Sequence, residues 1–319
     1  KTISFEFYKR GFLKYETKEF IGDVVVEHIG IPEHILEKYD NKEYMTDIEI
    51  IKNNIRAKDK YSFKSDFGKI ALFAGSRGFT GAAYISTQAA VKCGSGLTTL
   101  VTDSYVQDIA SQKLCEAMTL NIAENQKVIN LIKDCDAIGF GCGMGDNDDT
   151  YNRLEYILNN RTCPIIIDAD GLNVLKDKKE LLKSNPNRII ITPHLGEMSR
   201  LTGYPINYIR DNKVDAAKEF ANKYKVVVLL KGYETVITNG KYTYINPTGN
   251  SSMANGGMGD TLLGMITSFV GQGMTNLMGT VCAAYIHGYI GQRLSKDLYT
   301  VNASDVINLI PQTMKELIN

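Results

Sequence analysis

The chain has 319 residues, 44% of them hydrophobic, which is enough for one large core or for one full domain with a smaller piece. Its 36 Lys and Arg residues balance its 36 Asp and Glu residues. A chain without a basic excess is a poor candidate for general binding to nucleic acid or to an acidic membrane. Any phosphate group that it binds must therefore be held locally, by loops and helix ends.

The six cysteines show neither C-x-x-C spacing nor the cysteine and histidine spacing of a zinc site. We expect reduced, mostly buried thiols in a cytoplasmic protein. No apolar run approaches the ~20 residues that cross a bilayer, and no signal-peptide pattern is present. Because residue 1 is Lys and the chain opens on a strand-like pattern, we expect a fragment of a longer protein.

The first 66 residues predict a few small elements. The alternating sequence TISFEFY (2–8) is typical of a strand, and residues 23–31 predict a second strand that stops at Pro32. Residues 33–39 resemble a short helix. Residues 41–66 are polar and Lys-rich, so we interpret them as a linker, with a docked helix over residues 47–55 as the alternative.

From Lys69 onward, short apolar strands alternate with amphipathic helices. This rhythm predicts an α/β fold with a mostly parallel central sheet that is covered by helices on both faces. Residues 235–238 and 242–245, separated by Asn239 and Gly240, predict a hairpin. The predicted strands are 70–75, 97–102, 137–142, 164–170, 188–193 and 226–232, and the clearest helices are 82–91, 213–224, 259–270 and 277–294.

Segments rich in Gly and polar residues follow several of these strands. In such sheets, ligands bind beyond the carboxyl ends of the strands. We therefore expect a binding site where these segments meet. They are residues 75–81, 141–145, 168–173, 192–197 and 231–235.

The most informative segment is NPTGNSSMANGGMGDTLLG (246–264), a loop that runs into an apolar helix. Gly256, Gly257 and Gly259 allow the backbone to approach a ligand closely, and the helix start offers free N–H groups to phosphate. Asp260 lies in the first helical turn. It either complements the helix dipole or acts as a base toward an attacking hydroxyl, and we favour the base.

Other polar residues at strand ends have simpler alternatives. Asp168 and Asp170 suit a metal or a ribose, but we favour helix capping. A lone histidine such as His194 is more often structural, and with Glu197 it makes no convincing metal pair. Lys231 offers a cation to a nucleotide, although an ordinary strand-end lysine is nearly as consistent. The sequence contains neither a G-x-x-x-x-G-K-[ST] loop nor a protein-kinase signature.

Taken in order, these segments resemble the ADP-dependent NAD(P)H-hydrate dehydratase family of the ribokinase-like superfamily. The resemblance covers roughly residues 67–309. Two departures are Leu195, where proline is common, and Asn255, where a small hydroxyl residue is usual. The similar stretches are GSRGFTGAA (75–83), KCGSGLTTL (92–100), GCGMG (141–145), DADGLN (168–173), TPHLGE (192–197), KGYET (231–235) and NPTGNSSMANGGMGD (246–260).

Residues 2–32 resemble the end of the NAD(P)H-hydrate epimerase domain that precedes the dehydratase in bifunctional members of the family. The epimerase's phosphate loop and its catalytic half have no counterpart in these residues. The expected organisation is an epimerase-like remnant at 1–40, a linker at 41–66 and a ribokinase-like dehydratase domain at 67–319.

The resemblance implies a repair reaction in which ADP or ATP phosphorylates the hydroxyl of hydrated NADH or NADPH, and the phosphate then leaves. Asp260 would take the hydroxyl proton, and Ala82, Gly143, His194 and Glu197 would contact the hydrated dinucleotide. Mg²⁺ is expected at the phosphates, without a protein metal ligand. The implied nucleotide-binding residues are Lys231, Gly232, Tyr233, Glu234, Thr235, Asn250, Ser251, Ser252, Met253, Ala254, Asn255, Gly256, Gly257, Met258 and Gly259.

Two other functions remain open. A small-molecule kinase of the same superfamily would share the Gly-rich loop and Asp260 but would release a stable phosphorylated product. A nucleotide-binding module without turnover would also share the loop. The TPHLGE segment and the epimerase-like front argue against the kinase, and the retained Asp260 argues against the silent module. We also expect a homo-oligomer, with small molecules and neither nucleic acid nor membrane as partners.

Overall fold

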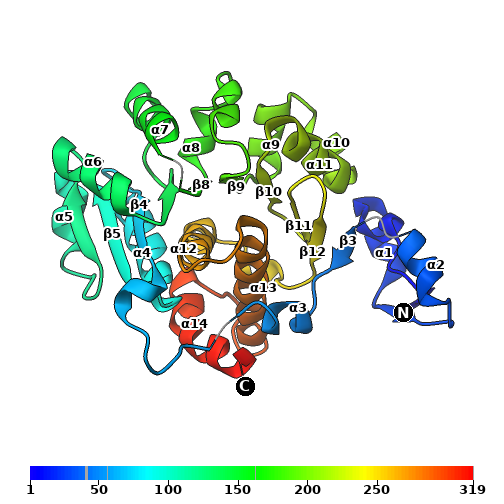
Figure 1. Cartoon of the computed structure of the whole chain (residues 1–319). Coiled ribbons are helices and arrows are strands. Elements are labelled where there is room, and N and C mark those ends of the chain that lie inside the picture. The colour runs from blue at the N-terminus through cyan, green and yellow to red at the C-terminus, as the bar shows by residue number, and fades with distance from the viewer. Residues whose placement is uncertain (40–41, 56, 162, 319) are drawn as a thin grey trace.

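The computed structural model describes residues 1–39, 42–55, 57–161 and 163–318. Its centre is a ten-stranded sheet in the order β3-β12-β11-β10-β9-β8-β7-β4-β5-β6 (Figure 1). The strands of this sheet are β3 Glu43–Met45, β4 Lys69–Phe73, β5 Leu97–Thr102, β6 Met118–Asn121, β7 Ala137–Phe140, β8 Ile165–Ile167, β9 Ile189–Ile191, β10 Val227–Leu230, β11 Thr235–Thr238 and β12 Thr243–Asn246.

The predicted mostly parallel sheet is confirmed. Among the described strands of this sheet, β11 alone runs against its neighbours, since it pairs antiparallel with both β10 and β12. The β11–β12 pair is the hairpin predicted around Asn239 and Gly240. The all-isoleucine strands β8 and β9 are fully buried, as strands covered on both faces must be.

Helices cover both faces of the sheet and enclose two hydrophobic cores. The core on one face includes residues of α4, α12, α13 and α14, and the core on the other includes residues of α6, α7, α9 and α11. The helices are α1 Lys18–Ile21, α2 Glu33–Lys38, α3 Ile48–Lys52, α4 Thr80–Lys92, α5 Ser104–Ala110, α6 Asn125–Asp134, α7 Asp148–Asn160, α8 Asp170–Asn173, α9 Leu195–Thr202, α10 Ile206–Asp211, α11 Lys213–Tyr224, α12 Met258–Gly271, α13 Asn276–Leu294 and α14 Ala303–Ile318.

Residues 42–55 do more than connect two parts of the chain. Residues Glu43–Met45 form the edge strand β3, parallel to β12, which the polar sequence did not predict. The helix left open over residues 47–55 is present as α3, and Asp47 caps it by accepting from Ile50 N at 2.8 Å. Ile51 of α3 is fully buried in the core with α12–α14. This part of the expected linker therefore belongs to the packed body.

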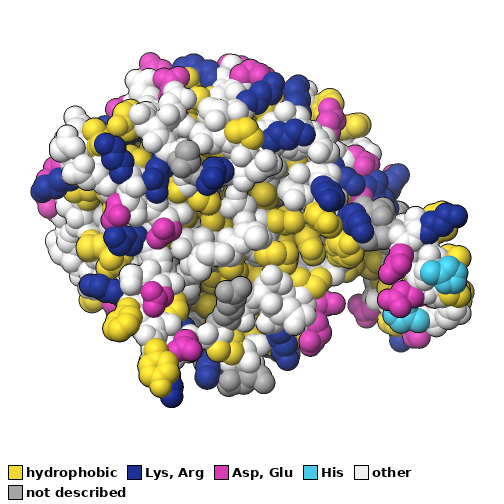
Figure 2. Space-filling model, in the orientation of Figure 1, with side chains coloured by type: hydrophobic (Ala, Val, Ile, Leu, Met, Phe, Trp, Pro, Cys, Tyr) yellow, Lys and Arg dark blue, Asp and Glu magenta, His cyan; other side chains and the backbone are white. Residues whose placement is uncertain are grey.

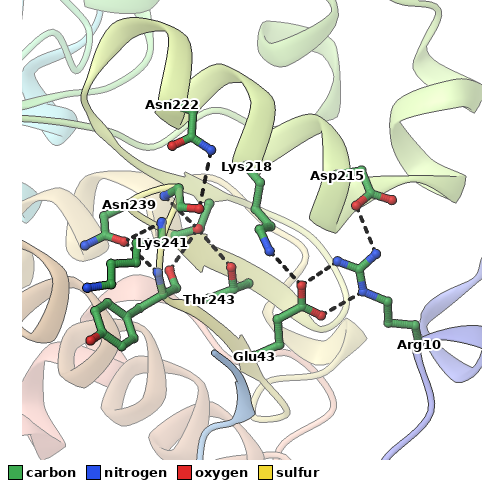
Figure 3. Close-up of polar contacts among 11 residues, drawn as sticks. Arg10, Glu43, Asp215, Lys218, Asn222, Asn239, Lys241 and Thr243 are labelled. Atoms are coloured by element: carbon green, nitrogen blue, oxygen red, sulfur yellow. Dashed lines mark hydrogen bonds and ion pairs between the residues drawn. The ribbon is translucent and has the colours of Figure 1, made fainter. Parts of the chain in front are cut away.

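The N-terminal segment, residues 1–39, lies to one side of the body (Figure 1). It contains the small parallel sheet of β1 Thr2–Phe5 and β2 Val24–Glu27. Arg10 attaches the segment through Glu43 of β3 and Asp215 of α11 (Figure 3). Arg10 Nε lies 2.7 Å from Glu43 Oε2, and Lys218 Nζ of α11 lies 2.8 Å from Glu43 Oε1. A buried carboxylate thus joins three parts of the chain.

None of the helices in the described residues combines the length and the apolar character that crossing a membrane requires.

Candidate active site

The glycine-rich segments that follow the strands of the sheet meet in space, as the sequence predicted. Gly141 has a left-handed φ of 121°, and a side chain there would collide with the backbone of Asp168 and Gly171. A Cβ on Gly143 would lie 2.8 Å from Phe79 Cβ and 3.1 Å from Ala82 Cβ. The loops after β4, β7 and β8 are therefore packed against one another, with glycine where the backbones are closest.

A buried charge cluster lies beside these loops. Lys231 Nζ, after β10, lies 2.7 Å from Asp168 Oδ1, after β8, and 3.8 Å from Glu197 Oε2 of α9. Burial alone would lower the pKa of Lys231, but Asp168 and Glu197 outweigh it and raise that pKa. Burial raises the pKa of Glu197. Lys231 is thus a constrained, charged group at the predicted site, with two carboxylates around it.

The capping role that we favoured for Asp168 and Asp170 is wrong. Ala169 is the residue before α8, and no side chain caps that helix. Asp168 is instead paired with Lys231, and Asp170 Oδ2 accepts from Gly145 N at 2.8 Å. Ala169 between them has a left-handed φ of 48°, which is unfavourable for a residue with a Cβ and is typical of functional sites.

Asp260 lies where the long glycine-rich loop turns into α12. Gly257 precedes the helix with a φ of 92°, and a Cβ there would lie only 2.9 Å from Ile85 Cδ1 and Ala303 Cβ. Gly259 brings the helix start close to the charge cluster, since a Cβ on it would lie 3.4 Å from Asp168 Oδ2 and 3.6 Å from Lys231 Nζ. The first turn of α12 and the Asp168–Lys231 pair therefore form one site.

The Asp260 carboxylate is partly buried beside the Cys142 thiol. Burial raises the pKa of Asp260, the Cys142 thiol lowers it, and Asp168 raises it, so that the net change is upward. Cys142 is 1% exposed, and burial raises the pKa of its thiol well above the usual range. The thiol therefore stays protonated. A single cysteine in a glycine-rich turn did not indicate that it would lie beside Asp260.

The loop before α12 is anchored by its own side chains. Asn250 Nδ2 donates to Ser295 Oγ at 2.7 Å, and Asn255 Nδ2 donates to the Val301 carbonyl at 2.6 Å. Met253 packs against Gly291 of α13, where a Cβ would not fit. Among the predicted nucleotide-binding residues, these three side chains thus shape the loop, and the backbone N–H groups of Met253, Ala254 and Asn255 are hydrogen-bonded within it.

His194 caps α9. Its Nδ1 accepts from Gly196 N at 2.9 Å and Glu197 N at 3.2 Å, and Glu197 Oε2 accepts from His194 N at 2.8 Å. This reciprocal arrangement is a capping box. The side chain remains 53% exposed, and burial together with Lys231 and Arg200 lowers its pKa, so the ring is neutral at physiological pH. His194 has the structural role typical of a lone histidine while it borders the site.

The residues of the loop 231–235 differ in their exposure to solvent. Gly232 and Tyr233 are exposed, whereas Glu234 is 8% exposed and its carboxylate faces Tyr8 and Lys18 of the N-terminal segment. Thr235 Oγ1 donates to the Gly232 carbonyl at 2.9 Å and tightens the turn. The Glu234 side chain is therefore occupied within the chain, and Gly232 and Tyr233 are the accessible part of this loop.

Two further findings concern metal ligands and the position of a cavity. The described residues contain no cluster of three or more His, Cys, Asp or Glu side chains arranged to hold a metal ion. A cavity of about 880 Å³ near the C-terminal ends of α12 and α14 is lined by none of the predicted site residues. The candidate site is the place where the loops, the charge cluster and the start of α12 meet.

Comparison with known proteins matches residues 70–312 to the family model described as NAD(P)H-hydrate dehydratase. The ADP-dependent (S)-NAD(P)H-hydrate dehydratase of Staphylococcus aureus is 36% identical over 83% of this chain and 95% of that protein. The bifunctional NAD(P)H-hydrate repair enzyme of Moorella thermoacetica is 28% identical over 99% of this chain, and the chain spans 62% of its length.

Solved structures agree with this assignment. A ribokinase-like superfamily protein from Enterococcus faecalis superimposes with a TM-score of 0.81 at 28% identity, over 88% of this chain and 98% of that chain. The ADP/ATP-dependent NAD(P)H-hydrate dehydratase of Bacillus subtilis, co-crystallized with ATP and Mg²⁺, gives a TM-score of 0.75 at 27% identity, over 86% of this chain and 98% of that chain. The sequence match, the shared fold and the loops around Asp260 lead to one conclusion: the chain belongs to the NAD(P)H-hydrate dehydratase family of ribokinase-like proteins.

Proposed function

We propose that this chain uses ADP or ATP to convert the S form of hydrated NADH or NADPH into the working cofactor, with release of phosphate. The observation that carries the proposal is the position of Asp260. It lies in the first turn of α12, after a glycine-rich loop and beside the Asp168–Lys231 pair. A base, a helix start for phosphate and a partly buried cation are the parts that phosphoryl transfer to a hydroxyl requires.

The reaction follows from the chemistry of the substrate. Hydrated NADH carries a hydroxyl on the ring carbon next to nitrogen, and hydroxide is a poor leaving group. Asp260 would take the proton of this hydroxyl while its oxygen attacks the terminal phosphorus of the nucleotide. The ring nitrogen's lone pair would then expel inorganic phosphate, and loss of a proton from the neighbouring ring carbon would restore the double bond.

The site suggests how the substrates are held. Gly232, Tyr233 and the loop of residues 250–259 would bind the adenine nucleotide, with phosphates at the free N–H groups of the α12 start. Ala82, Gly143, His194 and Glu197 would border the hydrated dinucleotide. Since the described residues lack a metal-ligand cluster, Mg²⁺ would be held chiefly by the nucleotide phosphates and would neutralise their charge.

We propose that residues 1–39 are the epimerase-like remnant and that residues 67–319 form the dehydratase domain. Residues 43–55, which we expected in a linker, pack with this domain. The cytoplasm is the proposed location because the six cysteines are free thiols, which persist in reducing compartments. We also propose that identical chains associate.

Product analysis tests the function. With the S hydrate, Mg²⁺ and ADP or ATP, we expect one inorganic phosphate released for each reduced nicotinamide restored, with absorbance at the NADH band rising in step. A small-molecule kinase would consume nucleotide, leave a phosphorylated small molecule and release no free phosphate. A binding module would give neither product. Absence of NADH formation under these conditions would refute the proposal and favour the kinase.

A further inference from the structure

The N-terminal segment touches the proposed nucleotide loop directly. Tyr8 Oη donates to Glu234 Oε1 at 3.1 Å, and Lys18 Nζ forms an ion pair with Glu234 Oε2. Lys18 Nζ also lies 4.4 Å from the centre of the Tyr233 ring, within cation–π range. Two residues of the segment thus contact two adjacent residues of the loop that contains Gly232.

The same loop is held from its other side by α11. Lys213 Nζ, in the first turn of that helix, donates to the Tyr233 carbonyl at 2.6 Å and to the Glu234 carbonyl at 3.1 Å. Lys213 is 9% exposed, and burial lowers its pKa to about 8. The backbone of the loop therefore depends on α11, and the Glu234 side chain depends on the N-terminal segment.

The backbone of Glu234 makes this loop sensitive to the loss of a contact. Glu234 has a left-handed φ of 52°, which a residue with a Cβ adopts only when its surroundings hold it there. Its carboxylate is 7% exposed, and a buried charge without its partner is strongly unfavourable. If Lys18 is removed, we expect Glu234 to turn toward water and to move Gly232 and Tyr233 with it.

We propose that Lys18 and Tyr8 are positioning residues for the loop of residues 231–235, so that the N-terminal segment sets the affinity of the site for adenine nucleotide. The inference rests on the proposed function, because it takes this loop as the nucleotide loop. Neither residue contacts the Asp260 region in the described contacts, so their effect is on binding of the nucleotide and not on the chemical step.

Equilibrium binding of ADP to the full chain tests the proposal. In Lys18→Met, calorimetry should show a Kd for ADP raised roughly 5- to 10-fold, because a hydrogen-bonded pair with a buried charge is lost. Tyr8→Phe removes one hydroxyl and should raise the Kd roughly 2- to 3-fold, and it carries the test should Lys18→Met fail to fold. At saturating ADP, kcat and the KM for the hydrate should stay within about twofold of the wild type.

Lys14→Met is the matched control. Lys14 lies in the same segment, is exposed, and its side chain makes no hydrogen bond or ion pair within the described residues. The charge change equals that of Lys18→Met, but the Kd for ADP should not change. Glu234→Gln completes a double-mutant cycle: Lys18→Met should add little to the Kd already altered in Glu234→Gln, because the pair acts as a unit.

The outcomes separate this inference from the proposed function. A folded Lys18→Met or Tyr8→Phe variant that binds ADP like the wild type overturns the inference, whatever the enzyme turns over. An equal change in Lys14→Met, or no ADP binding by the wild type, overturns it as well. A wild type that binds ADP but restores no NADH overturns the proposed function. The positioning role of Lys18 and Tyr8 is then decided by the Kd values for ADP alone.

Discussion

The N-terminal segment and helix α12 differ in how much of their apolar surface is buried. In α12, Met258 and the eleven residues from Thr261 to Gly271 are buried. In the N-terminal segment, Leu13 is the one buried hydrophobic residue among those described, whereas Phe20 is 83% exposed and Ile3 and Phe5 are each 60% exposed. Figure 2 shows the segment projecting from the body with both charged and hydrophobic side chains on its surface.

This contrast shows that apolar burial is concentrated in the body and not in the N-terminal segment. Burial of apolar surface contributes about 25 cal/mol per Å², so α12 ties the site to the core of the body. The segment is attached by Leu13, which belongs to the core that includes residues of α9 and α11, and by polar contacts such as those of Arg10 and Lys18 with buried carboxylates. Exposed ion pairs contribute about 0–1 kcal/mol each, and the desolvation of a buried charge offsets much of what its pair contributes. The segment therefore contributes little to the stability of the fold, which leaves room for the proposed positioning role of Lys18 and Tyr8.

The largest expected effect comes from a matched pair of phenylalanine truncations. Phe269 of α12 is 1% exposed, so Phe269→Ala should lower the free energy of unfolding by about 3–5 kcal/mol, from lost burial and the remaining cavity. Phe20→Ala should change it by less than about 0.5 kcal/mol. Urea unfolding of both variants gives the comparison. A large loss in Phe20→Ala would mean that the segment is packed in solution and that the contrast is mistaken.

The second effect concerns Asp260 in the first turn of α12, where a substitution should change turnover and not lower stability. Asp260→Asn keeps the shape but removes the base, so turnover should fall roughly 100-fold or more, equal to about 2.7 kcal/mol in the barrier, while nucleotide binding stays within a few-fold. Single-turnover assays and ADP titration measure the two separately. Near-normal turnover would exclude Asp260 from the catalytic role.

The pH dependence of the same residue has a definite sign. Burial raises the pKa of Asp260, and the base must be ionised, so activity should decline on acidification at a higher pH than for an exposed aspartate. The folded protein binds this proton more tightly than the unfolded chain, so the contribution of Asp260 to stability falls as pH rises from its unfolded pKa through its folded pKa. Asp260→Asn should therefore keep or raise the melting temperature at pH 7. A drop there would contradict the assigned burial.

The fold was largely predictable because its signals are local. Apolar strands between amphipathic helices predicted the parallel sheet, and Asn239-Gly240 predicted the β11–β12 hairpin. Strands β3 and β6 were missed because each lies at an edge of the sheet. An edge strand pairs with one neighbouring strand, so its sequence carries a weaker strand pattern. The packing of Ile51 into the main core was not visible in a polar, Lys-rich segment.

The meeting of the loops was predictable from the sequence, but the contacts between their side chains were not. Glycine-rich segments after parallel strands had to meet, and they do. The Asp168–Lys231 pair joins residues 63 positions apart, so only the strand order β10-β9-β8 brings them together. The position of Cys142 beside Asp260 and the ion pair of Lys18 with Glu234 depend on side-chain directions across distant elements, which sequence spacing does not encode.

The smallest expected effect concerns His194. This residue of the body is held by polar contacts, as Arg10 and Lys18 of the N-terminal segment are. His194→Ala removes the acceptor for Gly196 N and Glu197 N, so it should lower the free energy of unfolding by about 1 kcal/mol, the usual value of an N-cap.

His194→Asn supplies a good capping oxygen without the imidazole. If His194 only caps α9, the asparagine variant should recover both the melting temperature and the KM for the hydrate. We expect recovery of the melting temperature alone, with KM still raised, because 53% of the side chain is exposed at the border of the site. Recovery of both would remove His194 from the proposed substrate contacts and leave it as a structural cap.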